Sequence, residues 1–410
     1  MDFAIGQPLL QLLNLIIGFF LLRWMSVENY AQYGAAFAFQ STLSMIADLG
    51  FSSSILALSG GNAQDPSAIG RYLRSARYWR LRFTIVVGTL FTIAFPFIVS
   101  GQPWDMFTKF GILFSILAAV SVQVWMIYQI PLLAHRSVLK VYKPQLACSA
   151  IRLTFISILH AMNALNGLLA SWVGTIALGI SGAWMKRSAA PLVREPPKSI
   201  PEANFEMLKY LAPLMPGVLF TAFQSQISIG IITIFGSTQN IAEVAALGRL
   251  GQLFGILAAF NSVFIAPYFS SLPKIYLKKR YLQVFMVAII ISVSVSLTAF
   301  LLPEPLLWLL GNKYQNLENE VGIVVSTACI GFLGSVMWTI HAARKWIFWW
   351  GTFLYIFALS VSQIVSAIYL NLETTRGVVV FGFYSICACL VPHIATMILG
   401  FLYSEKNKKI

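Results

Sequence analysis

Long apolar segments follow one another along the whole chain and are separated by short polar connections. A helix needs about 20 apolar residues to cross a bilayer, and each of these segments is long enough. Twelve spans are predicted, at residues 3–22, 31–57, 83–100, 109–134, 144–163, 168–185, 210–235, 243–269, 282–302, 320–342, 347–370 and 377–402. The pattern therefore predicts an all-α, polytopic membrane protein with twelve transmembrane helices.

Two of the predicted spans share a faint internal repeat. Residues 26–59 align with residues 237–270, and the alignment pairs Ser26 with Ser237 and Asn29 with Asn240. The identities are few, but each copy includes the second predicted span of one half of the chain. Internal repeats of this kind are common in transporters.

The longest connection divides the predicted spans into two sets of six. This connection, residues 186–209, is rich in proline and charge and is predicted to be a cytoplasmic linker. It separates an N-terminal six-helix lobe, 1–185, from a C-terminal six-helix lobe, 210–410. Because six is an even number, both lobes enter the membrane in the same direction, so we expect pseudo-symmetric lobes around a central cavity.

Composition and charge fit this topology. Hydrophobic residues make up 58% of the chain and charged residues only 10%, whereas soluble domains carry about 25% charged residues. Most of the 28 Lys and Arg residues fall in the even-numbered connections and the C-terminal tail. The positive-inside rule therefore predicts that these connections and both termini are cytoplasmic. This distribution explains the net charge of +14 by contact with anionic membrane lipid, without a nucleic-acid partner.

Several other features carry no predicted chemistry. Arg71, Arg74, Arg77 and Arg80 repeat at helical spacing before the third span, and this arginine stripe is predicted to face solvent or lipid headgroups. The four cysteines lie inside apolar segments without metal-ligand spacing. No nucleophile–base pair or phosphate-loop motif is present, so the sequence predicts no enzyme, no catalytic residue, no metal and no cofactor. The first span begins without a preceding basic region, which predicts that there is no cleavable signal peptide.

Polar residues follow one face of the first span of each half. Gln7, Gln11 and Asn14 have the spacing i, i+4 and i+7, and Gln224 and Ser228 are four residues apart. We expect these side chains to line a water-accessible central cavity. The alternative is that they form hydrogen bonds between helices, which membrane bundles use freely.

Three charged residues lie well inside predicted spans, away from the span ends, and such residues commonly mark substrate or ion pathways. They are Asp48, Arg152 and Arg249. Arg152 could instead pair with Asp48, and Arg249 could extend to the outer headgroups. Two arginines against one aspartate make a shared cavity positive, which favours an anionic substrate such as a phosphate. The candidate substrate-binding residues are therefore Arg152, Arg249, Asp48, Gln7, Gln11, Asn14, Gln224 and Ser228.

Several segments match loose motifs of one transporter family. They are LLRWMSVENYAQYGAAFAFQ followed by DLGFS, then APLMPG, AALGRLGQLFG and LLPEPLLWLLGNKYQN. With these segments the chain resembles the polysaccharide transporter branch of the multidrug/oligosaccharidyl-lipid/polysaccharide export superfamily. That branch contains the bacterial flippases of O-antigen and related lipid-linked oligosaccharides.

The resemblance implies a two-lobed flippase that works by alternating access. It would move a polyprenyl-diphosphate-linked oligosaccharide across the bacterial cytoplasmic membrane for O-antigen, capsule or exopolysaccharide synthesis. A glycan polymerase and a chain-length regulator are the partners that it implies. The alternatives are a multidrug or cation antiporter, which should have more membrane carboxylates, and a peptidoglycan-precursor flippase, which usually has two further C-terminal helices. A third alternative is a membrane-embedded glycan polymerase, which should have a long outer loop.

Overall fold

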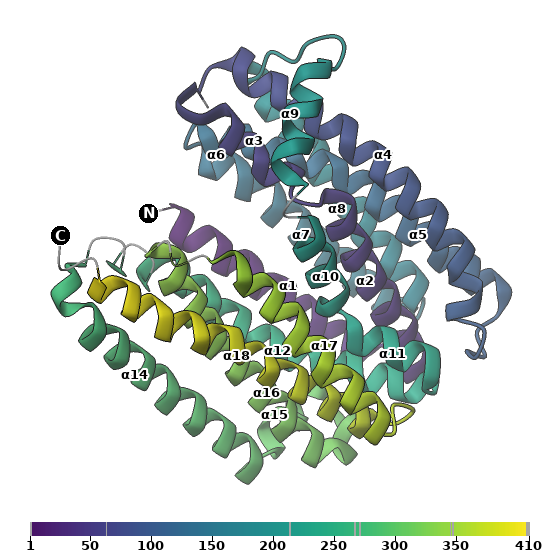
Figure 1. Cartoon of the computed structure of the whole chain (residues 1–410). Helices are drawn as coiled ribbons and strands as arrows, with labels where there is room; N and C mark the ends of the chain where they lie inside the picture. The colour runs from purple at the N-terminus through teal and green to yellow at the C-terminus, as the bar shows by residue number, and fades with distance from the viewer. Residues whose placement is uncertain are drawn as a thin grey trace. The chain divides into compact units, whose positions relative to one another are not determined.

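A computed structural model describes residues 2–62, 64–212, 215–265, 268–269, 272–344, 346 and 348–406. Within these ranges the chain is helical and contains no β-strand (Figure 1). It divides into two compact units, Met1–Ala242 and Glu243–Ile410. The all-α class predicted from the sequence is confirmed.

The first unit contains eleven numbered α-helices and the start of a twelfth in its described residues. They are α1 (Asp2–Trp24), α2 (Val27–Asp48), α3 (Phe51–Ser59), α4 (Pro66–Ile98), α5 (Met106–Gln123), the 3₁₀ helix η2 (Val124–Tyr128), α6 (Gln129–Ala134), α7 (Val138–Ala161), α8 (Gly167–Ala189), α9 (Pro201–Leu211), α10 (Met215–Ser225), α11 (Ile227–Phe235) and the start of α12 (Thr238–Phe260). The second unit continues with η4 (Asn261–Ile265), α14 (Lys274–Leu301), α15 (Glu304–Leu310), η5 (Asn312–Leu317), α16 (Glu318–Ala343), α17 (Trp349–Tyr369) and α18 (Thr375–Lys406).

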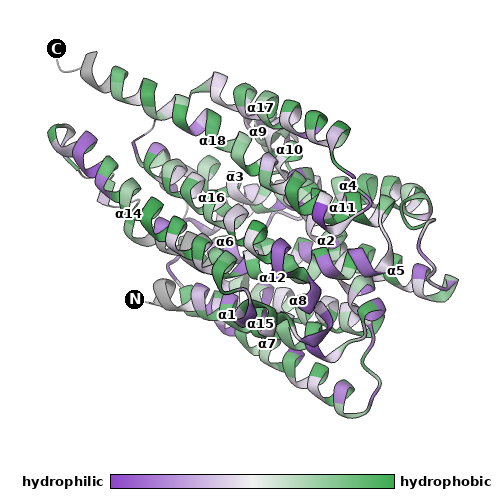
Figure 2. Cartoon of the chain, turned by 90° about the horizontal axis from the view of Figure 1, so that it is seen from below, coloured by the Kyte–Doolittle hydropathy of each residue, from purple (hydrophilic) through white to green (hydrophobic). Residues whose placement is uncertain are grey.

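Each of the twelve predicted spans coincides with a helix or a helix pair in the described ranges. Nine of these described helices are long and apolar enough to cross a membrane, or ten if α10 and α11, which meet at a bend of 55°, form one broken span. The helices α7 and α12 match the fifth and eighth predicted spans but are not among the ten, and α7 carries Lys140, Lys143 and Arg152. Large apolar side chains are exposed along α4 and α14, as expected of helices that face lipid. Figure 2 shows both ribbons largely in the hydrophobic colour. The protein is a multi-pass membrane protein.

The two copies of the internal repeat begin in the same way. The helix α2 begins one residue after Ser26 and α12 one residue after Ser237. The Ser26 hydroxyl accepts a hydrogen bond from the Asn29 amide at 3.2 Å, and the Ser237 hydroxyl accepts one from the Asn240 amide at 3.3 Å. These matched N-caps support the alignment that pairs these serines and asparagines.

Both copies also lose regular α-helical geometry at equivalent positions. The helix α2 ends at Asp48, because Leu49 and Gly50 have φ angles of 41° and 84°. In the second copy α12 ends at Phe260, the position aligned with Leu49, and the chain continues as the π-helix η4. The two helices thus end within one residue of the same repeat position, which agrees with two halves of related architecture.

The boundary of the first unit differs from the predicted lobe boundary. The first unit includes α10 and α11, which pack on α2, whereas the sequence assigned residues 210–410 to one lobe. The division into lobes at 1–185, 186–209 and 210–410 therefore stays a prediction about the membrane topology. Residues 213–214, which fall in the segment APLMPG, lie outside the described residues.

The predicted linker is docked on the first unit. Its residue Glu195 forms an ion pair with Arg77 at 3.1 Å and accepts a hydrogen bond from the Tyr128 hydroxyl at 2.7 Å. Further along, two side chains of α4 donate hydrogen bonds to α9. The Trp79 indole donates to the Asn204 carbonyl, and the Tyr72 hydroxyl donates to the Glu206 carboxylate. The segment predicted as a linker is thus largely a structural part of this unit.

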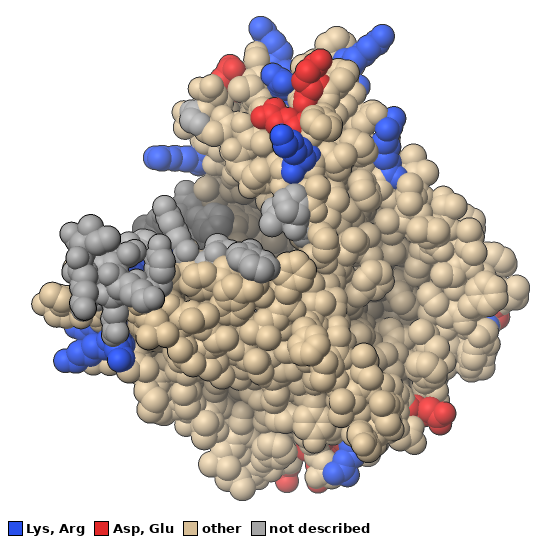
Figure 3. Space-filling view, viewed as in Figure 1, with Lys and Arg blue, Asp and Glu red and all other residues tan. Residues whose placement is uncertain are grey.

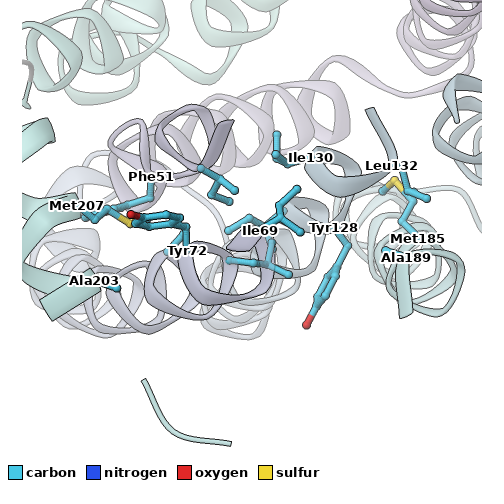
Figure 4. Packing of buried hydrophobic residues seen from close by; sticks show 14 of the residues in the cluster. Phe51, Ile69, Tyr72, Tyr128, Ile130, Leu132, Met185, Ala189, Ala203 and Met207 are labelled. Atoms are coloured by element: carbon cyan, nitrogen blue, oxygen red, sulfur yellow. The ribbon is translucent and has the colours of Figure 1, made fainter. Parts of the chain in front are cut away.

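A hydrophobic cluster joins the docked segment to the helices around it in the first unit (Figure 4). Its buried side chains come from α3, α4, η2, α6, α7, α8 and α9, together with Leu49 between α2 and α3. The helix α9 contributes Ala203, Met207 and Leu211. Pro201 occupies the first turn of α9, where its missing N–H has no intrahelical role.

Two arginines of the stripe, Arg74 and Arg77, contact this docked segment and Arg80 is buried, which corrects the prediction that the stripe faces solvent or headgroups. Arg74 donates a hydrogen bond to the Pro197 carbonyl, Arg77 pairs with Glu195, and Arg80 is buried. The i, i+3 spacing keeps Arg74 and Arg77 on neighbouring positions of α4, and both meet the docked segment. What the spacing could not show is that the chain returns more than a hundred residues later to contact these arginines.

Docking can be tested at Gly70, where a side chain would collide with the linker. A Cβ at this position would lie 2.2 Å from the Arg194 carbonyl oxygen. We expect Gly70→Ala to weaken docking by about 2 kcal/mol, within the usual range for overpacking. Since cleavage follows the population of the open form, trypsin should cut after Arg194 or Lys198 about 30-fold faster.

The matched control for this experiment is Gly101→Ala, because no atom lies within 4 Å of a Cβ at Gly101. It should leave the cleavage rate unchanged. Equal cleavage of Gly70→Ala and the unmodified protein would mean that the linker does not rest on α4.

The charge distribution makes a second prediction, on topology. Figure 3 shows Lys and Arg side chains, with a few acidic ones, at the end of the first unit formed by α3, α6 and α9. Reporter fusions after Lys198 are expected to lie in the cytoplasm, and fusions near Asn166 or Glu318 outside it. The reversed pattern would refute the orientation. The basic tail at 408–409 lies outside the described residues.

Candidate functional site

A buried ion pair joins α2 and α4 in the first unit. Arg80 Nε lies 3.2 Å from Asp48 Oδ1, and Arg80 is only 3% exposed. The same guanidinium donates hydrogen bonds to the Ser52 hydroxyl at 3.3 Å and the Gln123 carbonyl at 3.1 Å. Ser52 in turn donates to Asp48. A buried arginine is costly unless it is paired and hydrogen-bonded, and these contacts meet that requirement.

This pair corrects an alternative drawn from the sequence, in which Asp48 would pair with Arg152. Arg152 instead donates a hydrogen bond from Nη2 to the hydroxyl of Tyr33 on α2, at 2.8 Å. Its guanidinium also lies close to Gly174 of α8. In the part of the chain that the structure describes, Arg152 forms no ion pair.

The Asp48–Arg80 pair lies in the wall of a cavity of about 450 Å³ within the first unit. Its walls come from α2, α3, α4, α5, η2, α6 and α8. Apart from the ion pair, the polar lining consists of Gln40, Ser41, Ser44, Ser52, Gln123 and Gln129. Sequence reasoning included only Asp48 of this set in the candidate site.

One feature of the sequence could have indicated this cavity. Gln40, Ser44, Asp48 and Ser52 recur every four residues, so a polar face runs along α2 toward α3. The cavity also depends on contacts from distant segments. Arg80, Gln123 and Gln129 come from later helices, and no local pattern places them opposite α2.

Part of the cavity wall is fixed by buried hydrogen bonds. The Gln40 amide donates to the Ser171 hydroxyl at 3.0 Å, and Ser171 lies 2.9 Å from the hydroxyl of Ser115. Thr175 donates to the Ser171 carbonyl. These contacts join α2, α5 and α8 on one side of the cavity.

The polar stripe on α1 meets α7 in the structure. Gln7 accepts a hydrogen bond from the Tyr142 hydroxyl at 3.2 Å, and Asn14 accepts one from Ser149 at 3.5 Å. The Oε1 atom of Gln11 is buried without a hydrogen-bond partner among the described residues. The contacts of Gln7 and Asn14 fit the interhelical alternative, and their place in a substrate path stays a prediction.

The candidate residues in the first predicted span of the second half, Gln224 and Ser228, do not lie on one straight helix. Gln224 is on α10 and Ser228 is on α11, and the two helices meet at 55°. Both side chains are half-buried. The four-residue spacing assumed a continuous helix, so it does not establish a shared face.

The candidate arginine of the second unit is buried. Arg249 on α12 is 6% exposed and donates a hydrogen bond to Gln252 at 3.1 Å. Glu243 on the same helix is also buried and accepts hydrogen bonds from Thr375 and Asn316. This burial does not match the alternative in which Arg249 extends to the outer headgroups. Among the described residues no cluster of three His, Cys, Asp or Glu side chains could hold a metal.

Comparison with solved structures shows the fold. The chain is similar to the lipid II flippase MurJ in an inward closed conformation, with a TM-score of 0.71 and 15% identity over 99% of this chain and 90% of that one. It is also similar to an inward-facing multidrug resistance MATE family transporter of the MOP superfamily, with a TM-score of 0.67 and 15% identity over 97% and 94%. A MATE protein in a bent conformation gives a TM-score of 0.65 and 13% identity over 99% and 95%. No protein-family model and no curated protein matches the chain.

These similarities extend over nearly the whole chain and over nearly the whole of each solved structure. The protein therefore has the fold shared by MATE transporters and the MurJ flippase.

Proposed function

We propose that this protein is a membrane flippase that moves a polyprenyl-diphosphate-linked oligosaccharide across the bacterial cytoplasmic membrane. The product would serve the synthesis of a surface polysaccharide such as O-antigen, capsule or exopolysaccharide. The fold supports a transporter, since its structural neighbours are transporters and a flippase. The fold does not distinguish a lipid-linked glycan from a drug.

The choice of an anionic substrate rests on which intramembrane charges of the first unit form ion pairs. Asp48 is engaged by Arg80, whereas Arg152 forms no ion pair within the described residues. The remaining intramembrane charge of this unit is thus positive. A guanidinium matches phosphate oxygens in charge and in geometry, so a diphosphate fits Arg152.

A cation antiporter is the second candidate, and it needs a carboxylate that can exchange a proton or a metal ion. Asp48 lies well inside its predicted span, whereas Glu243 and Glu320 are the first residues of theirs. The ion pair of Asp48 with buried Arg80 would have to break before Asp48 could bind a cation. This arrangement favours the flippase.

The proposal is tested by deleting the gene in its native host. We expect loss of surface polysaccharide and accumulation of the lipid-linked oligosaccharide inside the cell, with unchanged resistance to cationic drugs. A glycan polymerase and a chain-length regulator would act after this step. Normal polysaccharide together with lower drug resistance would refute the flippase and support the multidrug antiporter.

A further inference from the structure

The cavity in the first unit has polar groups to offer a ligand. The side chains of Ser41, Ser44, Gln123 and Gln129 line it and are half-buried. Within the described residues none of these four side chains has a hydrogen-bond partner in the protein. Each Gln amide can donate two hydrogen bonds and accept others, and each Ser hydroxyl can do both. The cavity therefore presents both donors and acceptors that a ligand could satisfy.

The charge of the cavity selects the class of that ligand. Asp48 and Arg80 contribute opposite charges at 3.2 Å from each other, so the ion pair is close to neutral as a whole. A diphosphate would need an excess of positive charge, and a cation would need a free carboxylate. The ligand that fits is uncharged, or nearly so, and rich in groups that both donate and accept hydrogen bonds.

The apolar part of the wall completes this description. Phe37, Met45 and Met126 line the cavity together with its amides and hydroxyls. A sugar ring has hydroxyls at its edge and C–H groups on its faces, so it can use both kinds of wall. The volume of about 450 Å³ lies in the range of about 300–1,000 Å³ that small-ligand sites occupy.

From these observations we propose that the cavity lined by α2, α3, α4, α5, η2, α6 and α8 binds a sugar residue of the transported glycan. The inference rests on the proposed function and adds a sugar site to it. Gln40 is held in place by buried Ser171 and Ser115, so this wall is fixed before the ligand arrives. Arg152 lies near α2, one wall of the cavity, because it contacts the Tyr33 hydroxyl. The Tyr33 ring stacks on that of Phe37, a cavity residue one turn later, with 6.2 Å between the ring centroids.

The test measures whether free sugars protect the cavity from a thiol reagent. The full-length protein is purified with its four native cysteines replaced by alanine, and Ser44→Cys or Gln129→Cys is added. A small, charged methanethiosulfonate is the reagent, and the probes are glucose, galactose, N-acetylglucosamine and glucuronate. At least one sugar should slow labelling along a saturable curve, reaching about tenfold at ten times its dissociation constant.

Two controls accompany this measurement. Glycerol at equal osmolality should not slow the labelling of the cavity cysteines. Ser67→Cys, at an exposed position outside the cavity, should label at one rate with or without sugar. If no sugar slows labelling, or if glycerol slows it equally, the cavity holds water but no sugar site and the proposal is overturned. The proposal is also overturned if neither cavity cysteine reacts, since the cavity would then be closed.

A second pair of variants separates this site from the proposed function. Ser44→Phe fills the cavity and should abolish surface polysaccharide, whereas Ser44→Ala should retain it. If the gene is required for polysaccharide but Ser44→Phe at normal membrane level is fully active, the sugar site fails and the flippase stands. If sugars protect Ser44→Cys but deletion leaves polysaccharide intact, the proposed function fails while the cavity still binds sugar.

Discussion

Replacing Asp48 with alanine is expected to destabilise the protein by about 3 kcal/mol, the lower end of the range for breaking a buried ion pair. The variant leaves the buried guanidinium of Arg80 facing an apolar methyl group. The lower end applies because the Asp48 side chain is 28% exposed. The measurement is the free energy of unfolding, or the midpoint of thermal unfolding, of the purified protein.

A double-mutant cycle with Arg80→Met supplies the control for this expectation. Removing the arginine alone leaves Asp48 unpaired. This should destabilise the protein less than an unpaired Arg80 does, because the Asp48 side chain reaches the cavity and is partly exposed. The double variant should therefore be less destabilised than the sum of the two single variants, because neither charge remains. Additive effects, or an Asp48→Ala protein as stable as the original, would contradict the ion pair.

Replacing Arg152 with alanine is expected to abolish surface polysaccharide while the protein stays in the membrane at its normal level. Arg152 forms no ion pair in the described part of the chain, so its loss leaves no buried partner charge. In the proposed function it holds the diphosphate. Arg152→Lys should retain partial function, because lysine keeps the charge but loses the bidentate geometry.

Tyr33→Phe is the matched control, since it removes the hydroxyl that Arg152 contacts but keeps the charge and the ring. It should leave most of the activity intact. The readouts are surface polysaccharide and the amount of protein in the membrane. A substrate role for Arg152 is refuted if Arg152→Ala, present in the membrane at its normal level, keeps normal polysaccharide.

The helices were predictable because lipid imposes a local rule. Each spanning segment must satisfy its own backbone hydrogen bonds, so an apolar run of sufficient length reports a helix without knowledge of its neighbours. The same holds for the start of the repeat, where Ser26 and Ser237 cap their helices through residues three positions away. In both cases the cause lies within a few residues of the effect.

The candidate site was less predictable because it depends on distant contacts. The sequence identified Asp48 and Arg152 as intramembrane charges but not their partners. Asp48 pairs with Arg80, 32 positions away, and Arg152 contacts Tyr33 on another helix. Spacing showed that Arg80 shares a face with Arg77, but not what covers that face.

The docked linker also shows where composition misleads. Prolines and charges predicted a cytoplasmic linker over 186–209, yet Pro201 begins a helix and Glu195 pairs with Arg77. A sequence window cannot separate a proline that interrupts structure from one that begins a helix. The distinction depends on the apolar face of α9, whose Met207 and Leu211 need a partner surface.

That docking has a consequence for the order in which the chain is made. The hydrophobic cluster of the first unit includes Leu49 near one end of its sequence range and Leu211 at the other. At about 5–20 residues per second, a ribosome needs about 10–30 s to synthesise the intervening chain. During that interval the apolar side chains of α3 and α4 lack their contacts with α9. We therefore expect the nascent first half to be exposed to aggregation and proteolysis until residue 211 has left the ribosome.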